Sequence, residues 1–438
     1  MKSVQIITLG CSKNTVDTEH ILYQVRDELQ IVPQEAEPAY VDYLLLNTCG
    51  FIGDAKEESV NAIMSAVQRK NDGMIGRLIV FGCLSQRYSK ELPKLIPEVD
   101  EWYGAREFDP VVRALGVTPK AENESGRIFT EEHPGSAYLK ISEGCDRRCS
   151  YCAIPYIRGA HRSVPVEKLV AETEFLASRG VKELVLIAQD TTYYGLDLYK
   201  KRTLAELIDR LSRVEGIEWI RIHYSYPSSF PEDVLEMMAH NPKVCPYLDI
   251  PLQHISDRML DMMHRHCDSR TTRELVRKLR SQVPGVALRT TMIVGHPGEG
   301  EEEFQELLDF VREAKFERLG AFTYSEEEGT YGAKHFADDI PQDVKDERLS
   351  RLMALQQEIS SEFNASRVGT EERVMVDAYA DGVLVCRSRY ESPEVDGEIL
   401  VRYDSSKTGG RPAENLLGEF VNVRIVGAGE YDLTAELI

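Results

Sequence analysis

Short apolar runs alternate with helical patterns over the first 125 residues. The runs at 4–9, 43–46 and 78–81 have the length of buried strands, and the apolar positions within 55–70 recur at helical spacing. Strands that alternate with helices in this way usually pair in parallel. The pattern predicts an open parallel α/β domain over residues 1–125.

The same alternation continues through a longer second segment. Candidate strands lie at 138–142, 183–188, 219–224, 247–250, 287–294 and 319–324, and candidate helices at 166–179, 203–214, 231–239, 270–282 and 301–314. Six such units predict a partial (β/α)6 barrel. An amphipathic helix at 341–367 is expected to tether the last segment, so the central domain spans residues 136–366. The charged stretch at 122–135, with Gly and Pro, predicts a linker before it.

Apolar and polar residues alternate in the last segment, 368–438. The alternation is clearest at 374–378, 398–402 and 420–426, and Asp381-Gly382 and Gly409-Gly410 are turn signals. This period of two predicts a small antiparallel β-barrel. The chain as a whole is therefore expected to be an α/β protein of three domains.

Composition narrows the class of protein. The 438 residues carry a formal net charge of −21, which opposes a general role in binding nucleic acid and suits a basic protein partner. No apolar run is long enough to span a membrane, and the N-terminus lacks the pattern of a signal peptide. These features predict a cytoplasmic protein with no membrane partner. In that reducing compartment nine cysteines indicate ligands or core thiols rather than disulfides.

Three cysteines lie close together just past the first strand of the central segment. Cys145, Cys149 and Cys152 have the spacing C-x3-C-x2-C. A structural zinc site normally takes four ligands and favours C-x2-C pairs. Three thiolates instead suit an iron–sulfur cluster that keeps one iron open for another ligand. A zinc knuckle or buried structural thiols remain the alternative.

A second set of cysteines follows the N-terminal strands. Each apolar run ends at a cysteine: Cys11, Cys49 and Cys83. One such cysteine is usually core filling, but parallel strands bring all three to the carboxyl edge of a sheet, where ligands bind. We therefore predict a second three-cysteine site, with close backbone approach to its ligand at Gly10, Gly50 and Gly82. Packing is the expected role of the others, Cys245, Cys267 and Cys386.

Polar residues also stand at the predicted strand ends of the barrel, where functional residues gather. They include Gln189, Asp190, Gln253 and His254. A single strand-end histidine is usually part of hydrogen-bonded structure, so no direct catalytic role is expected for His254. The glycine-containing turn at 295–300 is followed by glutamates that would repel a phosphate, and it is expected to line the barrel mouth.

The cysteine motif of the central segment, with Tyr151 before its third cysteine, resembles the signature of the radical S-adenosylmethionine (SAM) enzymes. That resemblance implies SAM bound to the open iron, with Tyr151 near the adenine. We expect Gln189 and Gln253 to contact the cofactor as well. The order of the six cysteines, followed by a small β-barrel, resembles the methylthiotransferases over nearly the whole chain. Their terminal barrel is called TRAM.

Longer stretches resemble one branch of that family, the bacterial enzymes that modify ribosomal protein uS12. These stretches are 188–199, 251–254, 289–299 and 393–397. The branch that modifies tRNA adenosine has an asparagine-rich segment where this chain has Gln-Asp-Thr-Thr. In addition, residues 368–438 hold 7 Lys or Arg against 14 Asp or Glu. An acidic TRAM segment suits a basic ribosomal protein, and tRNA is not expected as a partner.

The resemblance also implies a mechanism. A [4Fe-4S] cluster on Cys145, Cys149 and Cys152 would cleave SAM to a 5′-deoxyadenosyl radical, using an electron donor such as flavodoxin or ferredoxin. The radical would take hydrogen from the β-carbon of a substrate aspartate, and a second [4Fe-4S] cluster, on the N-terminal cysteines, would carry the methylthio group. No catalytic acid or base is expected, because the cofactors carry the chemistry.

Three alternatives stay open at this point. The first is a tRNA N6-isopentenyladenosine methylthiotransferase. The second is a non-catalytic iron–sulfur electron carrier or RNA-binding module, and the third is a scaffold stabilised by zinc.

Overall fold

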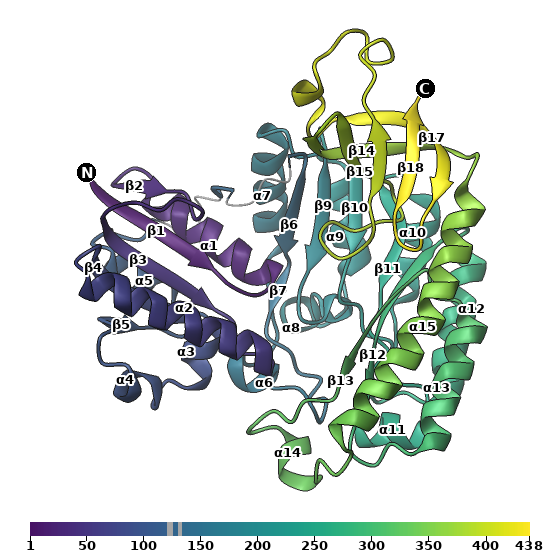
Figure 1. Ribbon diagram of the computed structural model, residues 1–438, viewed down its shortest axis with the longest axis horizontal. Coiled ribbons are helices and arrows are strands. Elements are labelled where there is room, and N and C mark those ends of the chain that lie inside the picture. The colour runs from purple at the N-terminus through teal and green to yellow at the C-terminus, as the bar shows by residue number, and fades with distance from the viewer. Residues whose placement is uncertain (121–125, 130–133) are drawn as a thin grey trace.

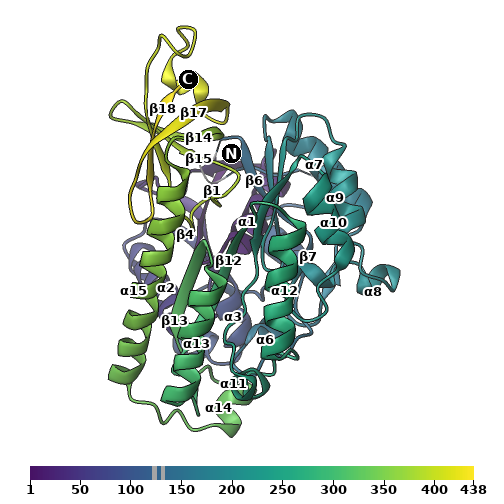
Figure 2. The same cartoon turned by 90° about the vertical axis from the view of Figure 1, so that its right-hand side faces the viewer.

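The computed structural model describes residues 1–120, 126–129 and 134–438. Strands of the described chain form a five-stranded sheet, a six-stranded sheet, a closed five-stranded barrel and a two-stranded ribbon (Figures 1 and 2). Most of the predicted linker at 122–135 lies outside the described residues.

The N-terminal sheet is parallel throughout and has the strand order β2-β1-β3-β4-β5. Its elements are β1 (Lys2–Thr8), α1 (Ser12–Val25), β2 (Leu29–Val32), β3 (Val41–Thr48), α2 (Gly53–Asn71), β4 (Ile75–Gly82), α3 (Cys83–Arg87), α4 (Leu92–Leu95), β5 (Glu101–Trp102) and α5 (Phe108–Ala114). The three predicted strands are confirmed. They become the centre of the sheet because their apolar runs are buried on both faces, under α1 and α5 on one side and α2 on the other.

The central sheet is also parallel, with the order β13-β12-β11-β10-β9-β6. Its strands are β6 (Ser136–Lys140), β9 (Glu183–Ile187), β10 (Trp219–Ile222), β11 (Val244–Asp249), β12 (Ala287–Val294) and β13 (Arg318–Thr323). The long helices are α7 (Val166–Ser178), α9 (Leu204–Ser212), α10 (Glu232–His240), α12 (Ser269–Gln282) and α13 (Glu301–Ala314). All six predicted strands and all five predicted helices are confirmed. The helices cover the outer face of the curved sheet, which forms an open, partial barrel (Figure 2).

Shorter elements lie in the connections of the central segment. They are β7 (Ser142–Glu143), α6 (Ile154–Ile157), β8 (Arg162–Ser163), the 3-10 helix η1 (Thr191–Tyr193), α8 (Leu196–Tyr199), α11 (Asp257–Met262) and α14 (Tyr331–His335). Among these, α6, α11 and α14 gather at the end of the barrel that lies lowest in Figure 1. That is the end at which the strands of the central sheet finish.

The predicted tether is confirmed as a helix, α15 (Gln342–Arg367), which runs along the barrel to the C-terminal strands (Figure 1). Its buried face is more polar than expected. Leu352 and Ile359 are buried, but so are Arg348 and Gln356. Arg348 donates to the Glu299 carboxylate at 2.8 Å, and Gln356 donates to the carbonyl of Phe316 at 3.0 Å. The prediction of an amphipathic helix was incomplete, because this helix packs on loop carbonyls and carboxylates as well as on apolar side chains.

The C-terminal segment is a closed barrel with the order β14-β15-β16-β18-β17. Its elements are β14 (Glu371–Ala380), β15 (Val383–Arg387), β16 (Ile399–Arg402), the 3-10 helix η2 (Ala413–Leu416), β17 (Phe420–Ala428) and β18 (Leu433–Leu437). Alternate residues of β17 and β18 point into the core, as the period of two predicts. The barrel is antiparallel except for one pair, because β16 and β18 run parallel.

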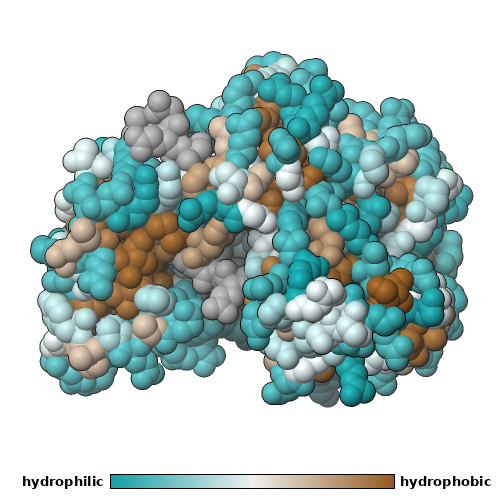
Figure 3. Space-filling model, turned by 90° about the horizontal axis from the view of Figure 1, so that it is seen from above, coloured by the Kyte–Doolittle hydropathy of each residue, from teal (hydrophilic) through white to brown (hydrophobic). Residues whose placement is uncertain are grey.

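The surface of the molecule is mainly hydrophilic in the view from above (Figure 3). Hydrophobic residues gather in a band over the N-terminal lobe and are scattered elsewhere on this face. In the part of the chain that is described, no helix combines the length and the apolar character that a membrane span requires.

The C-terminal barrel packs on the amino ends of the central strands. The rings of Trp219, at the start of β10, and Phe420 lie 4.6 Å apart between centroids. The loop between β15 and β16 reaches further into the barrel: Ser392 Oγ lies 2.7 Å from Nε2 of His223, the residue that follows β10, and the Tyr247 hydroxyl donates to Asp396 at 2.7 Å. One end of the central barrel is thereby closed, which leaves the carboxyl ends of its strands for a binding site.

Buried charges fix this contact. Glu183, at the start of β9, accepts from Arg221 at 2.9 Å and pairs with Arg387 of the C-terminal barrel at 2.9 Å, and all three side chains are almost fully buried. Burial alone would raise the pKa of Glu183, but Arg387 and Arg221 lower it to about 2. The carboxylate therefore stays ionised and holds the two barrels together.

We expect Glu183→Gln to destabilise the protein by about 3–5 kcal/mol, because two buried guanidinium groups lose their counter-charge. The measurement is chemical denaturation at neutral pH, with Glu371→Gln, in the exposed Glu371–Arg424 pair, as the control that leaves the midpoint unchanged. The folded pKa of Glu183 is depressed, so its contribution is present above the ordinary value of 4.5 and lost as the pH falls toward about 2. An equal acid sensitivity in wild type and Glu183→Gln would contradict this role.

Candidate functional site

A cavity of about 350 Å³ lies where the carboxyl ends of the N-terminal and central strands face each other. This volume is typical of small-molecule sites. The residues that line it follow the strands of both sheets: Cys11, Lys13, Cys49, Phe51, Cys83, Cys145, Arg147, Cys149, Tyr151, Cys152, Ile154, Arg158, Gln189, Tyr224, Ser225, Tyr226, Pro251, Gln253 and Arg265. All six cysteines singled out in the sequence are present, together with Tyr151, Gln189 and Gln253. The structure brings both three-cysteine sets into one chamber.

The N-terminal cysteines lie on three loops that pack against one another. Cys11 precedes α1, Cys49 follows β3, and Cys83 begins α3. A Cβ atom on Gly10 would lie 2.6 Å from Cys49 Cβ, and one on Gly82, whose φ is +108°, would lie 2.6 Å from the carbonyl oxygen of Thr48. These glycines therefore allow the neighbouring cysteine loop to approach closely, and their approach to a ligand stays a prediction.

A buried arginine of the central segment reaches into this N-terminal set. The Nε atom of Arg158 lies 3.1 Å from Cys83 Sγ, and its Nη1 atom donates to Asp17 at 3.0 Å and to Glu143 at 2.9 Å. Only 2% of Arg158 is exposed. Its partners lie as far as 144 residues away in sequence, so the local pattern around Arg158 holds no signal of this role.

The central cysteine loop is anchored on both sides. The backbone N–H of Cys145 donates to the carbonyl of Gly159 at 3.0 Å, and that of Ser150 donates to Met263 at 3.1 Å. Arg265 places Nη1 3.3 Å from Cys149 Sγ and 3.3 Å from the Tyr151 hydroxyl. A buried guanidinium thus faces each set of thiols, Arg158 at the N-terminal set and Arg265 at the central one.

Three thiols in each set suit the irons of an iron–sulfur cluster. Burial raises the pKa of Cys83 to about 11 and that of Cys145 to about 12. A bound metal centre favours the thiolate form of its cysteine ligands. Within the described residues no group of three His, Cys, Asp or Glu side chains converges tightly enough to hold one metal ion. The thiols of a cubane bind separate irons and stand further apart.

Polar atoms at the cavity wall fit a polar organic cofactor. Gln189 donates to Glu143 at 2.7 Å, while its Oε1 atom is buried with no hydrogen-bond partner in the described chain. The Nη2 atom of Arg147 and the Nε atom of Arg265 are also buried without a hydrogen-bond partner in the described chain. Gln253 has a φ of +76°, and its backbone is fixed between Thr291 and Ile293 of β12. Buried donors and acceptors left unsatisfied in this way are expected where a ligand completes them.

The remaining residues predicted from the sequence lie outside the cavity lining. His254 is fully buried with its Nε2 atom 3.4 Å from Glu299, in keeping with a structural role. Cys245 and Cys386 are fully buried in apolar clusters. Cys267 is only half-buried, so packing accounts for it less well.

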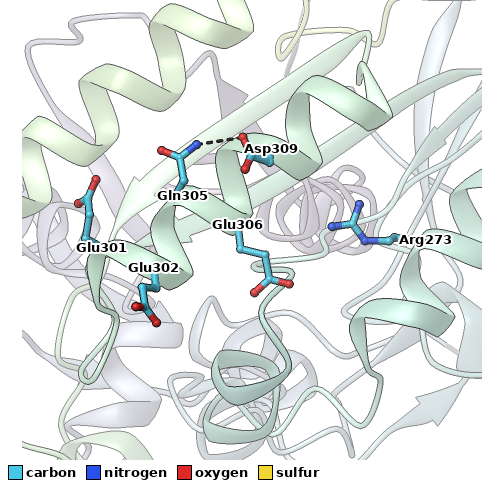
Figure 4. A pocket seen from close by; sticks show the side chains of 6 residues that line it. All are labelled: Arg273, Glu301, Glu302, Gln305, Glu306 and Asp309. Carbon is cyan, nitrogen blue, oxygen red and sulfur yellow. Dashed lines mark hydrogen bonds between the residues drawn. The ribbon is translucent and has the colours of Figure 1, made fainter.

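A second hollow, of about 560 Å³, lies on the outer surface along α13 (Figure 4). Its lining is mostly acidic, and Arg273 faces it from α12. Gln305 donates to Asp309 at 2.9 Å within the helix. These side chains are those of a solvated helix face, and the hollow carries no arrangement of groups aimed at a ligand.

A short segment after β13, residues 325–332, connects to residues next to both cysteine sets. The buried carboxylate of Glu327 pairs with Lys56 at 2.8 Å and Arg87 at 2.7 Å, both on the N-terminal side. Arg87 also donates to the carbonyl of Gly50, next to Cys49, at 2.9 Å. The N–H of Gly332 donates to the carbonyl of Ser150, beside Cys149, at 2.7 Å. We call this set of contacts the Glu327 clasp.

Comparisons with known families agree with this layout. The model of the radical SAM superfamily matches residues 139–311, that of the uncharacterized protein family UPF0004 matches residues 3–104, and that of the TRAM domain matches residues 368–438. Fold and site together thus define a radical SAM enzyme with an N-terminal UPF0004 segment and a terminal TRAM barrel. This class implies a [4Fe-4S] cluster and SAM, which the cysteine loop and the open polar atoms described above fit.

Full-length relatives narrow the class further. The chain is 48% identical over 438 residues to the ribosomal protein uS12 methylthiotransferase RimO of Bacteroides fragilis, covering 100% of this chain and 99% of the relative. It is 50% identical over 436 residues to that of Porphyromonas gingivalis, with 99% of both chains covered. It is 49% identical over 434 residues to that of Flavobacterium johnsoniae, covering 99% of this chain and 97% of the relative. The chain belongs to the family of the ribosomal protein uS12 methylthiotransferases.

Solved structures of lower identity share the fold. The radical SAM methyltransferase TsrM from Kitasatospora setae, with cobalamin and a [4Fe-4S] cluster bound, has a TM-score of 0.52 at 13% identity, covering 74% of this chain and 72% of that one. The cobalamin-dependent SAM radical enzyme OxsB has a TM-score of 0.53 at 14% identity, covering 82% of this chain and 56% of that one. At this identity the likeness concerns the arrangement of the elements alone.

We expect Glu327→Gln to loosen the cavity, because Lys56 and Arg87 lose the carboxylate that ties them to the central segment. Backbone amides of residues 50–56 and 325–330 should exchange with deuterium about tenfold faster than in the wild type, while the strands of both sheets keep their protection. Glu326→Gln is the matched control, since Glu326 is exposed in the same loop. Unchanged deuterium exchange of both segments in Glu327→Gln would show that the Glu327 clasp does not stabilise them.

Proposed function

We propose that this protein transfers a methylthio group to the β-carbon of an aspartate in ribosomal protein uS12. The observation that carries the proposal is the single cavity lined by both three-cysteine sets. A reaction with two clusters needs both to open on one space. The relatives that share the whole length of this chain are named uS12 methylthiotransferases. Their name is the reason for proposing uS12 as the substrate.

The three segments divide the work. Residues 136–366 hold one [4Fe-4S] cluster on Cys145, Cys149 and Cys152 and bind SAM through Tyr151, Gln189 and Gln253. Residues 1–125 hold a second [4Fe-4S] cluster, with Cys11, Cys49 and Cys83 as its ligands. Residues 368–438 form the TRAM barrel. When bound, the clusters and SAM supply the radical chemistry and the methylthio group.

The protein's own side chains position and protect these groups. The guanidinium groups of Arg158 and Arg265, 3.1 Å from Cys83 Sγ and 3.3 Å from Cys149 Sγ, stabilise thiolates as ligands. The C-terminal barrel closes the amino end of the central barrel and keeps water from that side of the chamber. No catalytic acid or base is required, because an acid or base side chain cannot remove hydrogen from an unactivated carbon and a radical can.

Charge favours a protein substrate over tRNA. The TRAM segment holds 7 basic against 14 acidic residues, and the chain carries a net charge of −21. An acidic surface attracts a basic ribosomal protein and repels phosphates. The TRAM barrel packs at the opposite end of the strands from the cavity, so it would contact the substrate outside the reacting region.

A small protein such as flavodoxin or ferredoxin would deliver electrons, in the cytoplasm where ribosomes are assembled.

Incubation of the reconstituted, reduced enzyme with SAM and either uS12 or tRNA tests the substrate. Mass spectrometry should find one hydrogen replaced by a methylthio group on a single uS12 aspartate, and tRNA should stay unmodified. Modification of tRNA adenosine with uS12 untouched would establish the tRNA branch instead. Failure to release 5′-deoxyadenosine from SAM would favour an electron carrier without this chemistry.

Removal of one cysteine set should remove one cluster. We expect the Cys11→Ala/Cys49→Ala/Cys83→Ala protein and the Cys145→Ala/Cys149→Ala/Cys152→Ala protein each to keep about half of the wild-type iron and sulfide. Only the first should still cleave SAM, and neither should methylthiolate uS12. Cys386→Ala is the control with full iron content. Wild-type iron in either triple variant would refute the ligand assignment.

A further inference from the structure

Among the described residues, four cations and no acid line the cavity: Lys13, Arg147, Arg158 and Arg265. Three of them have acceptors in the protein. Arg147 pairs with Asp190 at 2.6 Å, Arg158 pairs with Asp17 and Glu143, and Arg265 donates to the carbonyl of Pro251 and faces Cys149. An acid-free chamber rich in cations, inside a protein of net charge −21, is suited to anionic groups.

Lys13 differs from the other three. It is 7% exposed, yet among the described residues its Nζ atom makes neither a hydrogen bond nor an ion pair. It lies 3.2 Å from the centroid of the Tyr224 ring. An aromatic face offsets part of the cost of burying an ammonium group but accepts none of its hydrogen bonds in the usual geometry. The amine is therefore available to an anion that enters the cavity.

Tyr224 is held in place for this contact. Its φ is +56°, a left-handed conformation that is rare for a bulky side chain. Its N–H donates to Asp249 at 3.0 Å, and its carbonyl accepts from the N–H of Thr191 at 3.1 Å, so the strained backbone is fixed from two neighbouring connections. Strain of this kind is characteristic of functional sites.

The pair lines the same cavity as the two cysteine sets. Lys13 follows Cys11 by two residues, and Tyr224 precedes Tyr226 by two residues. The hydroxyl of Tyr226 lies 3.9 Å from Cys149 Sγ. A group bound to Lys13 Nζ would thus stand within the chamber that both sets share.

We propose that Lys13 binds the carboxylate of the substrate aspartate and thereby selects that side chain. This inference rests on the proposed function and names the residue that recognises the reacting group. The β-carbon of an aspartate is bonded to its carboxylate carbon, so an ion pair at the carboxylate fixes the reacting carbon to within one bond. Because Lys13 is 7% exposed, the pair is stronger than it would be at the surface and discriminates against the neutral amide of asparagine.

The competing role for Lys13 is to balance the charge of a centre bound at Cys11. That role predicts loss of iron from a Lys13 variant, with no effect on the choice between aspartate and asparagine. The two roles therefore differ in quantities that are measured separately.

The test compares the wild type with Lys13→Met and Lys13→Arg, each reconstituted anaerobically. Binding of labelled uS12 is followed by fluorescence anisotropy, and methylthiolation by mass spectrometry. A second uS12 carries asparagine at the modified position. Lys201→Met, which changes an exposed lysine that is not part of the cavity lining, is the control.

We expect Lys13→Met to bind uS12 about thirtyfold or more weakly, as when one member of a buried charge pair is removed, and to lose methylthiolation to a similar extent. Its iron content should equal that of the wild type. The wild type should bind uS12 in preference to the asparagine form, and Lys13→Met should bind both equally. Lys13→Arg, which keeps the charge, should retain part of the preference.

Two results would overturn the inference while leaving the proposed function intact. One is a Lys13→Met protein that still prefers aspartate over asparagine, and the other is a variant that loses iron with its preference unchanged. A wild-type enzyme that cleaves SAM but leaves uS12 unmodified would overturn the proposed function, and the role of Lys13 in selecting aspartate with it.

Discussion

One buried guanidinium, that of Arg158, ties together the two halves on which the cavity is built. It comes from the central segment, yet it faces Cys83 and pairs with Asp17 across the boundary between the sheets. A buried charge is tolerated only when its hydrogen bonds are complete, so the loops that carry Asp17, Glu143 and Cys83 must all stand where Arg158 requires them. The spacing between the two cysteine sets depends on this constraint.

The two ends of the central barrel have opposite roles. At the amino ends, Glu183 between Arg221 and Arg387 locks the TRAM barrel in place, and the loop that carries Ser392 fills the opening. At the carboxyl ends, short loops leave a chamber whose polar atoms are not fully paired within the described residues. Because the contacts at the amino ends stabilise the fold, the carboxyl ends can be lined by cations, thiols and a strained tyrosine.

Much of the fold follows from local pattern. The six central strands and their helices are predicted because buried parallel strands are short apolar runs and their covering helices repeat at 3.6 residues. The edge strands β2 and β5 are not predicted, because four and two residues give too little pattern. The face of α15 is misjudged because its buried partners, Glu299 and the carbonyl of Phe316, belong to distant loops.

The sequence by itself determined the elements, their order, the parallel sheets and the six cysteines, since each follows from composition and spacing over a few neighbouring residues. It placed Gln189 and Gln253 at strand ends by the same reasoning. Only the tertiary structure decided that both cysteine sets open on one chamber, that Arg158 faces Cys83, that Glu327 joins the two sides, and that Lys13 stands over Tyr224 without an acceptor of its own. These contacts join residues 75 to 271 positions apart, and no local periodicity records which distant charges a buried side chain will meet.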